Sequence, residues 1–179
     1  MTNQTNHGGL QLTLAFDPRT CRHTLDGQSY VMHCHHYAAL YTQLAEDCGM
    51  LDGKQLLADV AEETFHGVLS GYFARHELTS PAERFGAGEQ YFRAIGMGLM
   101  KVTAAGPDYG EVTMPFSHLD AGWVKKWGNC DRPVNHLGRG FIAALFAAAF
   151  DRPRHSYAVT ETVSIAAGAA ESHFSVVAG

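Results

Sequence analysis

The change of pattern near residue 98 constrains the fold of this chain more than any other feature of its sequence. Before it, apolar residues recur every three or four positions and predict helices over residues 33–48, 54–73 and 81–95. After it, strand patterns come in pairs over residues 99–116 and 154–178, with a helix of small residues between them within 131–150. This order predicts an α+β fold, with N-terminal helices packed on an antiparallel sheet.

Capping residues mark where two of these helices begin. Asp52 is the expected N-cap of the helix over residues 54–73, because its carboxylate can accept from the free N–H groups of the first turn. Ser80, Pro81 and Glu83 combine an N-cap, a proline at the first helical position and a capping-box partner. The third helix should therefore begin at residue 81.

Helical spacing also predicts which side chains face the core. Each stripe joins apolar side chains that share one face of a helix. The predicted stripes are His33, Tyr37, Leu40, Leu44 and Cys48 in the first helix, Leu57, Val60, Ala61, Thr64, Val68 and Tyr72 in the second (widened by Leu56, Phe65 and Leu69), and Val134, Leu137, Phe141, Leu145 and Ala148 in the small-residue helix.

The chain has 179 residues, which is enough for one domain with a substantial core. Residues 1–9 are polar and uncharged and predict a disordered tail, so we expect a single domain over residues 10–179. Residues 10–16 alternate in polarity and predict a strand. Asp26 and Gly27 lie between two short strand-like runs and predict a hairpin.

Charge and composition exclude several classes of protein. The net charge is −5 and the densest basic run is only Lys125-Lys126, so nucleic acid is not an expected partner. No apolar stretch reaches the ~18 residues that a membrane span needs. The chain starts without a signal-peptide pattern, and its 4 cysteines form no CxxC pair, which favours reduced thiols. We therefore expect a cytoplasmic protein.

The last third of the chain carries an ordered set of motifs. Pro133-Val134 precedes a glycine-containing helix, Phe150-Asp151-Arg152 closes it, and Glu161 ends the next strand; Ser164 and Ser172 then stand eight residues apart, with Gly168 between them and Phe174 after them. This set, over roughly residues 110–177, resembles the 4-vinyl reductase domain family. That family includes small-molecule sensing domains and hydrocarbon-binding proteins. The resemblance implies its fold, a small-molecule ligand and a homodimer.

The resemblance also implies what this chain lacks. Zinc-binding members hold a structural Zn²⁺ with Cys, Glu, Cys and Cys, and the matching positions here are Asn135, Glu161, Ser164 and Ser172. Serine hydroxyls are poor zinc ligands, so the resemblance argues against that zinc site. His136 and His173 lie one residue beyond two of these positions and are alternative ligands, although neighbouring side chains on a strand face opposite ways.

Glu161 can be read in two ways once its zinc partners are gone. A buried carboxyl has a raised pKa, which suits a general acid or base. Alternatively, Glu161 accepts hydrogen bonds from Asn135, Ser164 or Ser172, since buried polar groups are normally paired. We favour the second interpretation.

Four residues are candidates for a ligand pocket by resemblance. In phenol-sensing relatives the pocket lies between the helices and the strand before the motif, and the matching segment here contains Met114, Phe116, His118 and Trp123. Apolar side chains with one or two polar groups are typical of small-molecule sites. Each of the four could instead be an ordinary core residue.

The run His33-Cys34-His35-His36 is a second candidate site. His33 and His36 share one helix face, and the next helix carries Glu63 and His66 at the Glu-x-x-His spacing of helical metal sites. These four could bind a divalent metal, Fe or Zn, between the two helices. Alternatively, the carboxylate is solvated and the histidines cap and pack. Cys34 as a nucleophile at a helix start is a further possibility.

Two functions from different classes follow. The leading interpretation is a small-molecule-binding protein with an apolar or aromatic ligand pocket in a 4-vinyl-reductase-like fold. The alternative is a metal-dependent enzyme, hydrolytic or oxidative, that uses His33, His36, Glu63 and His66. A partner-binding or carrier protein with incidental histidines is a third. The sequence does not decide whether the protein is an enzyme.

Overall fold

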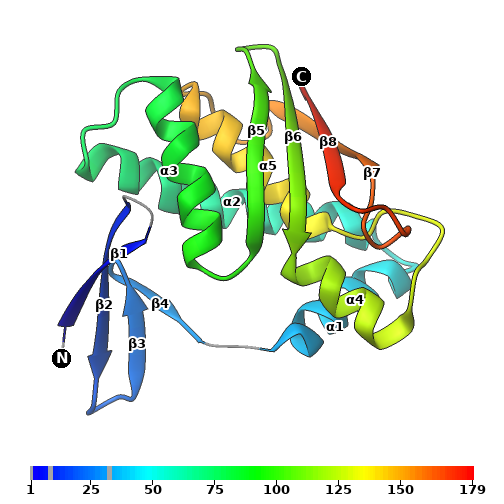
Figure 1. The fold of residues 1–179 in the computed structure, drawn as a ribbon, viewed down its shortest axis with the longest axis horizontal. Coiled ribbons are helices and arrows are strands. Elements are labelled where there is room, and N and C mark those ends of the chain that lie inside the picture. The colour runs from blue at the N-terminus through cyan, green and yellow to red at the C-terminus, as the bar shows by residue number, and fades with distance from the viewer. Residues whose placement is uncertain (1, 8–9, 32–33) are drawn as a thin grey trace. The chain divides into compact units, whose positions relative to one another are not determined.

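The computed structural model describes residues 2–7, 10–31 and 34–179. The chain separates into two compact units, Met1–Cys34 and His35–Gly179, which we describe one at a time (Figure 1). No helix of the described chain is long and apolar enough to cross a membrane.

The first unit is a four-stranded antiparallel sheet in the order β1-β2-β3-β4. Its strands are β1 Thr2–His7, β2 Leu10–Asp17, β3 Arg22–Leu25 and β4 Gln28–Tyr30. Strand β2 and the Asp26-Gly27 hairpin confirm the sequence predictions, with φ of 51° and 83° at the two turn residues, as a tight hairpin turn requires. Residues 2–7, predicted as a tail, pair with β2 along their whole length. Whether residues 10–179 form one domain stays a prediction.

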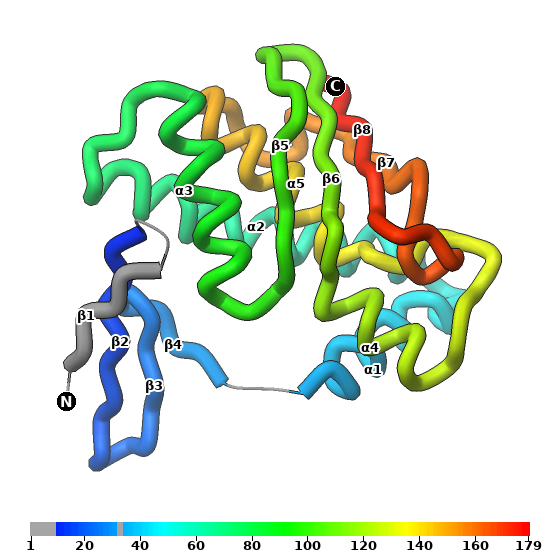
Figure 2. Tube along the Cα trace, in the orientation of Figure 1, coloured from blue at the N-terminus to red at the C-terminus, as the bar shows by residue number. Residues whose placement is uncertain are grey.

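The second unit, which the structure describes throughout, contains five helices and an antiparallel sheet. Its helices are α1 His35–Asp47, α2 Gly53–Arg75, α3 Pro81–Ala94, α4 His118–Trp127 and α5 His136–Ala149, and its strands are β5 Gly98–Ala105, β6 Tyr109–Ser117, β7 Tyr157–Val163 and β8 Ser172–Ala178. The sheet order is β5-β6-β8-β7, and Figure 2 shows β8 running between β6 and β7. The predicted α+β class and its antiparallel sheet are confirmed.

Helix α5 lies at the centre of this unit and packs against α2, α3 and β7. Almost all of its residues are buried, and Phe141 packs edge-on against Phe65 of α2 and Phe92 of α3. Small residues allow this close packing. A Cβ added at Gly140 would lie 2.1 Å from the carbonyl oxygen of Ala58, so only glycine permits this approach of α2 and α5.

The predicted helix starts are confirmed. The Asp52 carboxylate accepts from the Gln55 N–H at 3.0 Å. Ser80 and Glu83 form the complete capping box. Asn135 also caps α5, accepting from the Gly138 N–H at 2.9 Å, which the sequence did not predict.

The predicted core stripe of α1 is wrong. Tyr37, Leu40 and Leu44 are 55%, 42% and 59% exposed, whereas the buried residues of the helix are Ala38, Ala39, Thr42 and Ala45. Helix α1 packs against α4 and α2 through this face of small residues. In α2 the predicted Ala61, Leu69 and Tyr72 are buried, whereas Leu56 and Val60 are exposed and Ala58 faces the core. Close helix packing selects small side chains here over large apolar ones.

Candidate functional site

A cavity of about 530 Å³ lies beside the first half of α2, the start of α5 and β7. Its apolar wall includes Ala58, Ala143 and Val159. Its charged groups come from α2, from α5, from the segment before α5 and from Glu161 of β7. Small-molecule sites commonly combine such an apolar wall with a few convergent polar groups.

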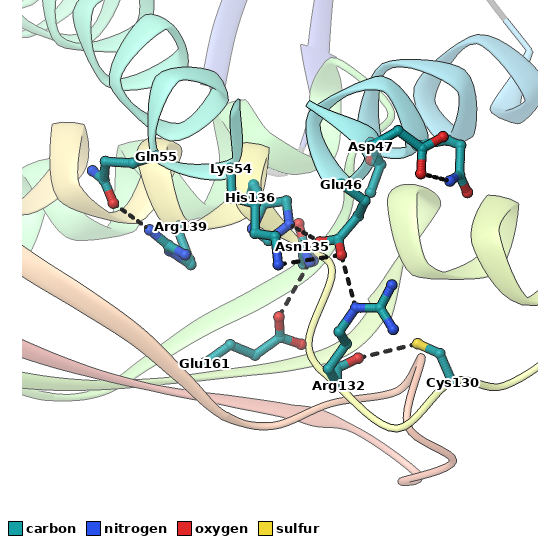
Figure 3. A network of polar contacts seen from close by, with 12 residues as sticks. Glu46, Asp47, Lys54, Gln55, Cys130, Arg132, Asn135, His136, Arg139 and Glu161 are labelled. Carbon is teal, nitrogen blue, oxygen red and sulfur yellow. Dashed lines mark hydrogen bonds and ion pairs between the residues drawn. The ribbon is translucent and has the colours of Figure 1, made fainter. Parts of the chain in front are cut away.

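One end of the cavity is organised by Glu46 of α1 (Figure 3). Its carboxylate accepts from Arg132 Nε at 2.7 Å, contacts His136 Nε2 at 2.8 Å and forms an ion pair with Lys54 at 3.4 Å. The side chain is 3% exposed. Burial opposes ionisation, but the hydrogen bonds from Arg132 and His136 and the charge of Lys54 hold the pKa of Glu46 below its usual value.

His136 contributes a buried imidazole to the same wall. Burial lowers its pKa, which favours the neutral ring. A neutral ring that donates through Nε2 to Glu46 keeps an acceptor lone pair on Nδ1. That nitrogen has no hydrogen-bond partner within the part of the chain that the structure describes.

Arg139 lies one helical turn further along α5. It donates to the Gln55 side-chain oxygen at 2.7 Å, and the Gln55 amide in turn donates to Asp59 at 2.7 Å. Within the described residues, Arg139 forms no ion pair with a carboxylate, and its Nε has no hydrogen-bond partner. A guanidinium that lines a cavity and has no carboxylate partner can donate hydrogen bonds to an anionic or polar group of a ligand.

A buried polar cluster lies where Glu161 of β7 meets the cavity. The Glu161 carboxyl accepts from the Asn135 backbone N–H at 3.2 Å and from the Ser172 hydroxyl at 3.0 Å. The Asn135 side-chain amide donates to Asp120 Oδ2 at 2.7 Å and to the Ser117 hydroxyl at 3.1 Å. The interpretation of Glu161 as a hydrogen-bonded partner of Asn135 and Ser172 is confirmed. Asp120, which is fully buried, was not predicted as a member.

The cluster holds two carboxyl groups, and no lysine or arginine of the described residues forms an ion pair with either of them. Burial, and then the charge of Asp120, raise the pKa of Glu161 to about 7. Burial also raises the pKa of Asp120. Two nearby carboxyls in a buried site favour the protonated form of one of them.

The four positions that the resemblance matches to zinc ligands are all buried and lie together, but they do not suit zinc. The Asn135 amide is fully used by Gly138, Ser117 and Asp120, and Ser172 donates to Glu161. The alternative ligands also lie elsewhere, because His136 contacts Glu46 and His173 contacts Glu171 at 3.1 Å. Structural zinc requires thiolate or imidazole ligands, and none of these four residues supplies either.

The four pocket candidates occupy different surroundings and none lines the cavity. Met114 is fully buried and its sulfur accepts from the Asn135 amide at 3.4 Å. Trp123 packs with Val134 and Ala166 in a small core cluster. Phe116 is 52% exposed, and His118 is half-buried with its ring near His35. Their role in ligand binding stays a prediction.

The predicted metal ligands are only partly described. His33 lies outside the described residues. His36 is exposed, Glu63 forms an ion pair with Arg154, and His66 Nε2 lies 3.1 Å from the Arg152 carbonyl oxygen. Among residues with described positions, these three do not gather as a group of metal-ligand atoms. The metal site at His33, His36, Glu63 and His66 stays a prediction. Cys34 is exposed.

Comparisons with solved structures support the fold. The chain is similar to the phenol-responsive sensory domain of the transcription activator PoxR, solved with phenol, with a TM-score of 0.77 and 14% identity over 92% of this chain and 84% of that one. It is also similar to a vinyl-4-reductase family protein from Methanocaldococcus jannaschii, with a TM-score of 0.53 and 12% identity over 80% of this chain and 77% of that one.

A third similar structure is trafficking protein particle complex subunit 3 from Naegleria fowleri, covalently bound to palmitic acid, with a TM-score of 0.51 and 12% identity over 81% of this chain and 95% of that one. No family model matches the chain, and no curated protein matches it in sequence. The chain therefore has a vinyl-4-reductase-like fold, and the comparisons carry no more than the fold.

Proposed function

We propose that this protein binds a small organic molecule in a vinyl-4-reductase-like fold. The observation that carries the proposal is the cavity of about 530 Å³ beside α2, α5 and β7, which combines an apolar wall with convergent charged groups. Two of the similar structures contain a small molecule by their descriptions, phenol and palmitic acid. This agrees with a ligand role for the fold.

The lining indicates the chemistry of the ligand. Ala58, Ala143 and Val159 suit an apolar or aromatic body. Arg139 has no carboxylate partner among the described residues and suits a carboxylate or another polar substituent. The expected ligand is therefore a small apolar or aromatic molecule with one polar or anionic group.

Binding should be measured with a panel that varies the body and the polar group separately. Phenol, benzoate, 4-hydroxybenzoate and hexanoate serve as probes, and amide shifts in a two-dimensional NMR titration report the location. Shifts concentrated at residues 54–62, 136–143 and 157–161 support this cavity. Shifts concentrated at Met114, Phe116, His118 and Trp123 would instead locate the ligand where the family resemblance implies. No saturable shift with any probe would refute small-molecule binding of this class.

Arg139→Gln tests the polar contact. The variant should weaken benzoate at least about ten-fold, since a charge-assisted hydrogen bond contributes ~1.5–3 kcal/mol, and should leave phenol nearly unchanged. Arg93→Gln, on α3, is a matched control because Arg93 does not line the cavity. Equal loss of benzoate and phenol in Arg139→Gln would contradict the assigned contact.

We also propose that the protein forms a homodimer through the outer face of α1. Tyr37, Leu40, Tyr41 and Leu44 are all more than two-fifths exposed and share this one helix. Such contiguous apolar side chains on a monomer commonly mark an interaction surface. A second copy of the chain is the expected occupant.

A further inference from the structure

Two carboxylates of α2 meet a histidine from a distant part of the chain. His155, which follows α5, lies with its Nδ1 3.2 Å from Glu62 Oε2 and 3.9 Å from Asp59 Oδ1. One ligand atom from each of the three residues lies within 4.8 Å of the other two. Atoms that bind one Zn²⁺ at ~2.0–2.2 Å lie roughly 3.0–3.6 Å apart, so small side-chain rotations would complete this geometry.

Glu62 is held in place for such a role. Its side chain is 5% exposed, and its Oε1 accepts from the His155 backbone N–H at 2.7 Å. This hydrogen bond fixes the carboxylate and leaves Oε2 directed at the imidazole. Asp59 and His155 are 39% and 60% exposed, so an ion can enter from the solvent side.

The two carboxylates of this group share one histidine as their ion-pair partner. No lysine or arginine lies within ion-pair distance of Asp59 or Glu62 among the residues described by the structure. Arg154 pairs with Glu63 and Lys54 with Glu46, and Arg139 is linked to Asp59 only through the Gln55 side chain. A buried carboxylate is costly without a compensating charge, and a bound metal ion would supply one.

We propose that Asp59, Glu62 and His155 form a binding site for a divalent transition-metal ion such as Zn²⁺, beside the cavity. Two carboxylates and one imidazole are suitable ligands for Zn²⁺, Fe²⁺ or Mn²⁺, and thiolates are absent from the set. This donor set differs at every position from the set predicted on the sequence, although Glu62 and Glu63 are adjacent residues.

Three protein ligands leave at least one coordination position open, as in catalytic rather than structural zinc sites. Asp59 and Glu62 also line the cavity, so a molecule bound there has access to the ion. The site does not depend on the proposed ligand, because a metal titration without any organic ligand tests it.

The neighbours Glu62 and Glu63 provide a matched pair of variants. Tag-free protein is stripped with chelator and titrated with Zn²⁺ against a chromophoric competitor, and Mn²⁺ binding is followed by electron paramagnetic resonance. Glu62→Gln and His155→Ala should each weaken the metal at least about ten-fold. Glu63→Gln and His66→Ala should stay within about two-fold of wild type.

The other results of the metal titration also decide whether Asp59, Glu62 and His155 bind the ion. His155 is exposed, so His155→Ala keeps the test valid if circular dichroism shows that Glu62→Gln fails to fold. Unchanged metal affinity in both Glu62→Gln and His155→Ala would overturn the proposal. The contacts would then only hold the segment after α5 against α2. Loss of metal in Glu63→Gln and His66→Ala instead would assign the ion to the set predicted on the sequence.

Discussion

The buried carboxyl of Glu161 makes a specific prediction about stability and pH. Its pKa is raised from 4.5 to about 7 by burial and then by Asp120. The folded protein therefore holds a proton on Glu161 at pH values where the unfolded chain has released it. Stability falls as pH rises between about 4.5 and 7, by ~1.4 kcal/mol per pH unit, and this contribution is constant above that window.

The change Glu161→Gln removes this titration while keeping the shape of the side chain. A glutamine oxygen can accept from the Asn135 N–H, and its amide can donate to the Ser172 hydroxyl, which are the two present partners of Glu161. At pH 5 the variant should be equal to wild type or less stable by about 1 kcal/mol. At pH 8 it should be more stable by roughly 2–3 kcal/mol, since the wild type loses ~1.4 kcal/mol for each of the two pH units between pH 5 and pH 7.

Urea denaturation from pH 5 to pH 8.5 measures both curves, and carbon NMR of the Glu161 carboxyl measures its pKa directly. Glu111→Gln, an exposed position on β6, is the control and should keep the wild-type slope. Asp120→Asn should lower the pKa of Glu161, because it removes a negative charge that raises it. A wild-type slope retained in Glu161→Gln, or a carboxyl that titrates near 4.5, would refute the assignment.

Three further predictions concern packing, capping and assembly. Gly140→Ala should lower the free energy of unfolding by about 1–3 kcal/mol, because the new Cβ would meet the Ala58 carbonyl. Gly86→Ala, whose Cβ would meet no atom within 4 Å outside its own helix, should raise it by up to ~1 kcal/mol. Thermal unfolding compares the two variants. Ser80→Ala removes the capping box of α3 and should cost about 1 kcal/mol in urea denaturation, with Thr79→Ala as control. Leu44→Asp should convert a dimer to a monomer in light scattering, whereas Leu99→Asp, also exposed, should not; a wild-type monomer at high concentration would contradict the dimer.

Local features of the fold could be predicted because their causes lie within a few residues. The Ser80 and Glu83 box and the Asp26-Gly27 turn are each determined by side chains at most three positions apart. The core face of α1 could not be predicted from the sequence, because it depends on which helix packs against α1. Gly122 of α4 approaches the His35 backbone so closely that an added Cβ would lie 2.8 Å from its carbonyl oxygen. Alanine side chains are small enough for two helices to approach this closely, and large apolar side chains are not.

The residues of the candidate site also differ in whether the sequence could predict them. Glu161, Asn135 and Ser172 could be grouped from the sequence only through a family resemblance, which places distant positions together. Asp59, Glu62 and His155 had no such guide, since 93 residues separate Glu62 from His155. Nothing in the Glu62-Glu63 pair itself tells which carboxylate turns inward, because the two differ only in the neighbours that folding supplies.

The buried cluster around Asn135 joins segments that are distant in the sequence through hydrogen bonds. A structural metal site stabilises by joining distant segments. In this chain hydrogen bonds do this, since Asn135 links the start of α5 to Ser117 and Asp120, and Ser172 links β8 to Glu161. Burial raises the pKa of both Glu161 and Asp120, which favours a proton on one of the two carboxyls. The raised pKa of Glu161 follows from its burial and from the nearby charge of Asp120, and its titration measures how strongly the cluster favours the protonated carboxyl.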